Sequence, residues 1–114
     1  MVENFISMID ATEGRIVNTG SLAGPMYTGN VCEEDQKAVW NNPKVTLEEL
    51  EAKITAVKPD LNNGSAYALS KGAVAIYASI VANKYPNIKS STAEPGVVDT
   101  AIVADFTRAK VSTD

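Results

Sequence analysis

The chain has 114 residues, 45% of them hydrophobic and 21% charged, with a formal net charge of −4. This balance is typical of a globular protein, and the length admits one domain. A nucleic-acid surface needs clustered positive charge, which a chain with a pI of about 4.8 and no basic run does not offer. The absence of histidine also excludes Ser-His-Asp and Cys-His nucleophile systems and His-based zinc sites.

The sequence predicts neither a membrane span nor a secretory signal. Its longest apolar stretch, residues 72–82, is too short to cross a bilayer, and its first residues lack a basic-then-apolar pattern. We therefore expect a cytoplasmic protein with no membrane or nucleic-acid partner. The single cysteine, Cys32, has no internal disulfide partner, and adjacent carboxylates disfavour its thiolate, so we expect it to be structurally neutral.

The first elements along the chain are the end of a helix and a short strand. Apolar side chains within residues 2–9 follow helical spacing. Residues 15–19 are short, β-branched and closed by Gly20, which predicts a buried parallel strand with Ser21 at its carboxyl end.

Residues 22–63 change in composition toward Gly, Pro, Asn and acidic side chains. Two short helices are predicted inside this insertion, at residues 33–40 and 47–57. Thr46 followed by Glu49 predicts a capping box at the start of the second helix.

The strongest predicted helix spans residues 66–85 and ends at Pro86. Its many alanines let neighbouring backbones approach closely, so we expect it to pack against a sheet and another helix. A weaker strand follows at residues 88–94 and stops before Pro95. Strand, crossover helix and strand form one βαβ unit, and open α/β sheets bind ligands at the carboxyl ends of such strands.

Tyr67 and Lys71 lie four residues apart in this helix and therefore share one face. A phenol is a poor acid at neutral pH because its pKa is about 10, and an adjacent ammonium favours the phenolate. Ser21, at a strand end, could hold a substrate carbonyl oxygen beside the Tyr67 hydroxyl. The same spacing at Tyr85 and Lys89 is interrupted by Pro86, so no catalytic pair is expected there.

Three sequence blocks resemble the short-chain dehydrogenase/reductase family in order and spacing. They are Gly14-Arg15-Ile16-Val17-Asn18-Thr19-Gly20-Ser21, Tyr67-Ala68-Leu69-Ser70-Lys71-Gly72-Ala73 and Glu94-Pro95-Gly96-Val97-Val98-Asp99-Thr100. They are similar to the family's fifth strand with its catalytic serine, its Tyr/Lys helix and its Pro-Gly-x-x-x-Thr segment, and together they extend over nearly the whole chain.

The resemblance implies an α/β chain with a partial Rossmann-like, doubly wound parallel sheet: one βαβ unit plus a helical insertion, in a single partial domain over residues 1–114. It implies NAD(P)H-dependent reduction of a small carbonyl compound, or oxidation of an alcohol, with NADP(H) favoured and no metal. The implied catalytic residues are Ser21, Tyr67 and Lys71. The implied cofactor-binding residues are Tyr67, Lys71, Pro95, Gly96, Val98 and Thr100.

The insertion at residues 22–63 resembles the carbonyl-reductase branch of the family, in which this segment covers the substrate side and blocks the usual dimer helix. A monomer is then expected for a complete protein, although exposed sheet edges favour association of the partial domain. By resemblance Met26 and Trp40 could line the pocket, but aromatic and Met side chains more often fill cores. The acidic triplet of residues 33–35 could hold a metal, but a favourable charge at a helix N-terminus is the simpler interpretation.

Other hypotheses remain open at this point. The chain carries no Gly-rich turn after a first strand, the feature that holds a cofactor pyrophosphate, so we expect it to be the C-terminal half of such a reductase and to fold only marginally alone. Alternatively, it is a noncatalytic module that docks onto a complete family member. An extended-type epimerase, which also uses Tyr and Lys with a nicotinamide, is a further candidate.

Overall fold

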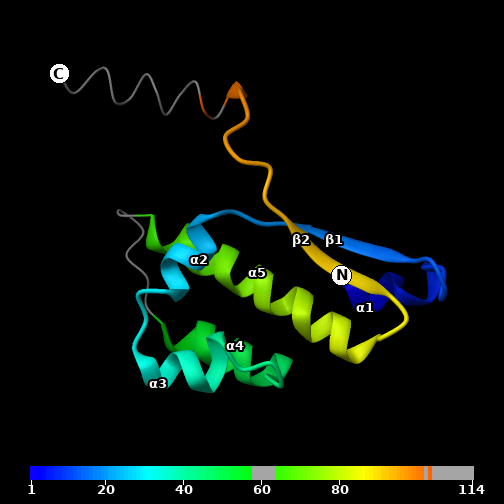
Figure 1. The fold of residues 1–114 in the computed structure, drawn as a ribbon, viewed down its shortest axis with the longest axis horizontal. Helices are drawn as coiled ribbons and strands as arrows, with labels where there is room; N and C mark the ends of the chain where they lie inside the picture. The colour runs from blue at the N-terminus through cyan, green and yellow to red at the C-terminus, as the bar shows by residue number, and fades with distance from the viewer. Residues whose placement is uncertain (58–63, 102, 104–114) are drawn as a thin grey trace.

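The protein is a mixed α/β chain with a two-stranded parallel sheet and several helices (Figure 1). The computed structural model describes residues 1–57, 64–101 and 103. Within this part, helix α5 (Ser65–Lys84) lies in the middle, with the sheet along one side and the shorter helices of the insertion along the other (Figure 1).

The N-terminal helix is shorter than expected. It consists of α1 (Val2–Phe5) followed by a 3₁₀ turn at Ile6–Met8, and both end before the strand. Strand β1 occupies Arg15–Thr19, as predicted, and β2 occupies Lys89–Ala93 within the predicted range. The two strands run parallel, with Val17 opposite Ser91.

Residues 22–57, the described part of the insertion, contain three helical segments, one more than predicted. The unexpected one is α2 (Ala23–Thr28), which packs closely on α5. The predicted helix at residues 33–40 is observed as α3 (Glu33–Asp35) continued by a π-helical turn, Gln36–Trp40. Helix α4 (Leu47–Ala56) begins with the predicted capping box: the Thr46 Oγ1 accepts from the Glu49 amide at 3.2 Å, and the Glu49 carboxylate accepts from the Thr46 amide at 2.8 Å.

Helix α5 starts and ends one residue before the predicted bounds. In the described part of the chain it is the one helix long and apolar enough to cross a membrane, with a mean hydropathy of 1.3. The core helix of a soluble protein meets the same criteria of length and composition, and α5 contacts α2, α4, β1 and β2.

The hydrophobic core lies between α5 and the insertion rather than between α5 and the sheet. Its buried members are Val39, Trp40, Val45, Leu50 and Leu69. Leu50, from α4, is only 2% exposed. By contrast, residues of both strands alternate between half-buried and exposed, and Val17 on the outer face is 61% exposed. The prediction of a buried strand at residues 15–19 was therefore wrong: in the described structure a helix covers one face of the sheet, and the other face is open.

Candidate functional site

A cleft of about 900 Å³ opens at the carboxyl ends of the two strands. It is bordered by the end of β1, the first turns of α5 and the segment that follows β2. All seven residues predicted for catalysis or cofactor binding line it: Ser21, Tyr67, Lys71, Pro95, Gly96, Val98 and Thr100. The topology therefore brings together three stretches that are far apart in the sequence.

Ser21 is positioned by the end of β1 and the start of α2. The amide of Gly20 donates to the carbonyl oxygen of Ala93 at 2.7 Å, which extends the parallel pairing to the last residue before Ser21. The Ser21 Oγ accepts from the amide of Ala23 at 3.2 Å, a local turn contact that fixes the half-buried serine at the cleft. As a hydroxyl oxygen, Oγ keeps its proton available for donation to a ligand.

Lys71 is tied to the end of β1. Its Nζ donates to the carbonyl oxygen of Thr19 at 3.0 Å, so the amine lies at the strand end two residues before Ser21. The same Nζ is 5.8 Å from the centroid of the Tyr67 ring, one helical turn earlier, within the range of a cation–π contact. Tyr67 itself is 55% exposed, which leaves the phenol accessible from the cleft.

A close approach of α2 to α5 sets the distance between the two sides of the site. A Cβ added at Gly24 would lie 2.9 Å from the Gly72 amide nitrogen and 2.9 Å from the Lys71 carbonyl carbon. Only a glycine fits at this crossing without a shift of backbone. Because Gly24 follows Ser21 by three residues, the same contact holds the loop with Ser21 against the start of α5.

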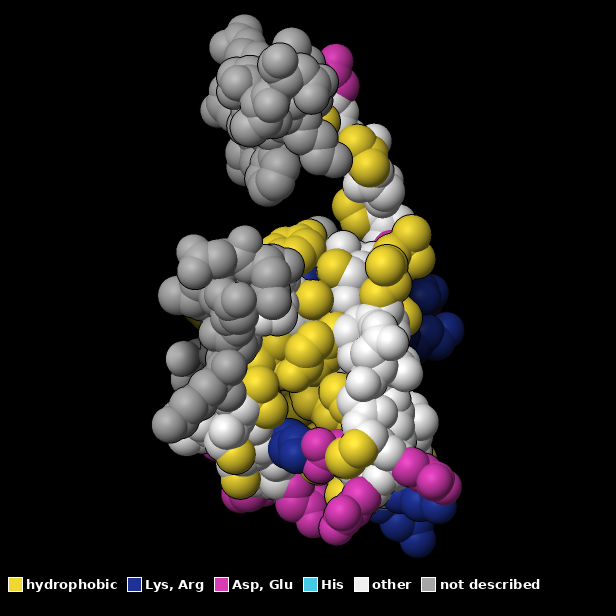
Figure 2. All heavy atoms as spheres, turned by 90° about the vertical axis from the view of Figure 1, so that its left-hand side faces the viewer, with side chains coloured by type: hydrophobic (Ala, Val, Ile, Leu, Met, Phe, Trp, Pro, Cys, Tyr) yellow, Lys and Arg dark blue, Asp and Glu magenta, His cyan; other side chains and the backbone are white. Residues whose placement is uncertain are grey.

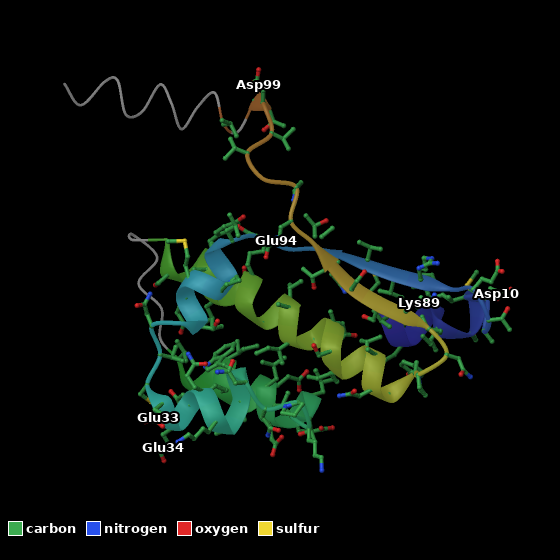
Figure 3. The ribbon with its side chains drawn as sticks, in the orientation of Figure 1. Asp10, Glu33, Glu34, Lys89, Glu94 and Asp99 are labelled. Carbon is green, nitrogen blue, oxygen red and sulfur yellow. The ribbon has the colours of Figure 1, made fainter. Side chains whose placement is uncertain are left out.

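The segment after β2 forms the third side of the cleft and then leaves the body of the molecule (Figures 1 and 3). Gly96 has a φ of +74°, a left-handed conformation that suits glycine at this turn. Val97 and Val98 are 89% and 51% exposed, so the segment brings apolar side chains to the rim. Glu94, at the end of β2 in Figure 3, and Lys71 are the charged side chains among the described lining residues.

Several lining residues were not predicted, namely Thr19, Gly20, Leu22, Glu94, Val97 and Val103. Most of them adjoin a predicted residue in the sequence, and this adjacency was the available signal. Met26 is 70% exposed and is not among the residues that line the cleft, so the packing interpretation of it was wrong. Trp40 is 7% exposed and belongs to the core, where its ring meets that of Tyr27 edge to face at 5.8 Å, as the packing interpretation predicted.

The acidic triplet occupies the first turn of α3, where it complements the helix N-terminus; Glu33 and Glu34 are labelled in Figure 3. Glu33 pairs with Lys37 at 2.5 Å, and Asp35 pairs with Lys53 of α4. The Lys53 ammonium holds the pKa of Asp35 below its ordinary value of 3.8. In the described residues, no group of three or more His, Cys, Asp or Glu is arranged to hold a metal ion.

The second Tyr-x-x-x-Lys pattern does not form a pair on one helix. Tyr85 follows the last residue of α5, and Lys89 is the first residue of β2. The ring of Tyr85 instead lies under Lys84, whose Nζ is 5.5 Å from the ring centroid. Pro86 therefore separates the two residues, as predicted.

No family model, curated protein or solved structure matches the chain. The likeness to short-chain dehydrogenases/reductases consequently remains a prediction based on its three sequence blocks and on the residues that those blocks contribute to one cleft.

Proposed function

We propose that this chain is the catalytic half of a short-chain dehydrogenase/reductase of the carbonyl-reductase type, with a partial Rossmann-like sheet. In this proposal the protein catalyses the NADPH-dependent reduction of a small carbonyl compound and is located in the cytoplasm. The observation that carries the proposal is the joint lining of one cleft by Ser21, Tyr67 and Lys71 together with the 95–100 segment.

The volume and lining of the cleft fit a nicotinamide and a small substrate. A cleft of about 900 Å³ is at the large end of ligand sites, which measure roughly 300 to 1,000 Å³. Pro95, Gly96, Val98 and Thr100 would hold the nicotinamide end, with the Thr100 hydroxyl and backbone near Val98 available to a carboxamide. Lys71, tied to the Thr19 carbonyl at 3.0 Å, adds a positive charge at the inner wall.

Three side chains divide the chemistry of carbonyl reduction between them. When bound, the reduced nicotinamide supplies the hydride that reaches the carbonyl carbon. Ser21 donates a hydrogen bond to the carbonyl oxygen and orients it. Tyr67 transfers its phenolic proton to the same oxygen, so that the product is the neutral alcohol, and the Lys71 ammonium stabilises the phenolate that remains.

The direct test is NADPH binding and NADPH consumption by the whole 114-residue chain with a panel of small aldehydes and ketones. Cofactor fluorescence measures binding, and the loss of NADPH absorbance measures turnover. Tyr67→Phe should lower the rate by roughly 100-fold or more while NADPH still binds, because a general acid contributes about that much.

Tyr85→Phe is the matched control, since Tyr85 occupies the second Tyr-x-x-x-Lys pattern outside the cleft, and its rate should equal that of the native chain. Cofactor consumption in proportion to carbonyl would also separate a reductase from an epimerase, which regenerates its cofactor. Equal rates of NADPH consumption for Tyr67→Phe and the native chain would refute the proposal.

A further inference from the structure

The carboxylate of Glu94 is the negative charge among the described residues that line the cleft. Glu94 directly follows Ala93, the last residue of β2, and Figure 3 labels it where that strand ends. A Cβ added at Gly20 would lie 3.4 Å from the Glu94 Cγ, so the side chain of Glu94 lies against the residue that immediately precedes Ser21. A negative charge is therefore present near the hydroxyl to which the proposed reaction assigns the carbonyl oxygen.

The two charged side chains of the cleft differ in whether the protein itself occupies them. The Lys71 ammonium donates to the Thr19 carbonyl oxygen at 3.0 Å and lies 5.8 Å from the centroid of the Tyr67 ring. The Glu94 carboxylate is exposed and forms no hydrogen bond or ion pair with the described residues. An unpaired carboxylate attracts a cation and repels an anion, and both effects are stronger in a partly desolvated cleft than in open water. The free charge that a bound substrate meets is therefore negative.

The remaining lining of the cleft includes apolar side chains that are open to a ligand. Leu22, Val97 and Val98 line the cleft and are all exposed. They are available to the hydrocarbon part of a substrate, because removal of apolar surface from water is favourable. Apolar walls with one free carboxylate suit an organic cation better than a sugar or a keto acid.

We propose that Glu94 is a specificity-determining residue and that the preferred substrates are carbonyl compounds that carry an ammonium group on a hydrocarbon frame. Ser21 and Tyr67 hold the carbonyl oxygen, and the Glu94 carboxylate pairs with the cation. Carbonyl compounds with a carboxylate are disfavoured, because their charge has the same sign as that of Glu94. This inference rests on the proposed carbonyl reduction and adds the charge of the substrate to it.

A pair of isosteric aldehydes tests the preference for positive charge. The compounds para-(trimethylammonio)benzaldehyde and para-tert-butylbenzaldehyde have the same shape and differ by one charge. The ratio of their kcat/KM values, cationic over neutral, should fall about fivefold in Glu94→Gln, the size expected for one exposed charge pair. The effect of each substituent on the intrinsic reactivity of the aldehyde is equal in both proteins and cancels. Glu34→Gln removes the same charge outside the cleft and is the matched control, with an unchanged ratio expected.

Charge reversal and a binding measurement complete the test. Glu94→Lys should favour para-formylbenzoate over the trimethylammonio aldehyde, the reverse of the native order. The corresponding benzamides, which NADPH does not reduce, are titrated by NMR, so that Glu94 is tested without turnover; the preference for the cationic amide should fall about fivefold in Glu94→Gln. Ratios of kcat/KM or of dissociation constants that do not change in Glu94→Gln would overturn the role of Glu94 alone. Equal rates for Tyr67→Phe and the native chain would instead count against the reductase proposal alone.

Discussion

The two sides of α5 differ in how they are built. On the insertion side, α2, α3 and α4 bury a cluster of large apolar residues that includes Leu50 and Trp40. On the sheet side, the described residues form two short strands with an open face and two free edges, and β2 carries mostly small polar residues. The comparison indicates that the insertion supplies most of the stability, whereas the sheet side positions the predicted catalytic residues. Figure 2 shows apolar side chains gathered in the middle of one face of the molecule and acidic ones at its lower end.

Apolar-to-alanine substitutions should give the largest difference in the free energy of unfolding between the two sides of α5. Leu50→Ala should lower the free energy of unfolding by about 2 to 5 kcal/mol, because it leaves a cavity in the cluster. Val17→Ala, on the open face of the sheet, should change it by no more than about 0.5 kcal/mol. Urea unfolding followed by circular dichroism measures both. Equal effects would mean that the sheet side is as tightly packed as the insertion side.

Two glycines, Gly24 and Gly72, test the close approach of α2 to α5. Gly24→Ala should destabilise the fold by about 1 to 3 kcal/mol, because the new Cβ would meet the backbone of Lys71. Gly72→Ala is the matched control: its new Cβ would meet a Thr28 methyl group at 3.0 Å, and a side chain can move. Thermal unfolding of both variants measures the difference. If Gly72→Ala proves the more damaging, the close approach of Gly24 does not determine the crossing.

Removal of the capping box tests how much the start of α4 contributes to the stability of the insertion side. Thr46→Ala removes the acceptor for the Glu49 amide and should lower the free energy of unfolding by about 1 kcal/mol. Thr55→Ala, near the end of the same helix, is the control and should have a smaller effect, because it removes only a side-chain bond to the Glu51 carbonyl. Urea titrations can resolve the two; a larger loss from Thr55→Ala would contradict the capping role.

The ion pair between Asp35 and Lys53 gives the smallest expected effect, visible in the pH dependence of stability. Stability depends on pH here because Lys53 lowers the pKa of Asp35 in the folded chain. The unfolded chain therefore binds protons more readily than the folded chain. The stabilisation is therefore present above the ordinary pKa of 3.8 and is lost as the pH falls through the lower, folded-state value.

Asp35→Asn should make the stability less dependent on pH in this acid range, as measured by urea midpoints across a pH series. Glu34→Gln is the neighbouring control, since Glu34 makes no ion pair among the described residues. If both variants change the acid dependence equally, the pair with Lys53 is not its source.

Much of the fold follows from local sequence signals, and the exceptions have a common cause. The β-branched run of β1, the Thr46/Glu49 box and Pro86 each determine an element boundary through nearby residues. Helix α2 was missed because Gly24 and Pro25 are poor helix formers, and the helix depends on its packing against α5. Tertiary contact, rather than local preference, decides that segment.

In the candidate site, too, some features follow from local sequence and others depend on tertiary contacts. The positions of Ser21, Tyr67 and Lys71 relative to strand ends and a helix face follow from spacing alone. The bond from Lys71 to the Thr19 carbonyl depends on how α5 packs against β1, and Leu22 lines the cleft because the chain turns from β1 into α2 at that point. The exposure of β1 also depends on tertiary structure, because a β-branched strand is buried only where a second layer covers it.

The most direct measurement of the central claim is a two-dimensional NMR titration of the isotope-labelled chain with NADPH. Binding in the cleft at the strand ends should shift the amide signals of Ser21, Lys71 and residues 96–100 while leaving those of α4 in place. Shifts confined to other parts of the protein, or no shifts at saturating NADPH, would contradict the account.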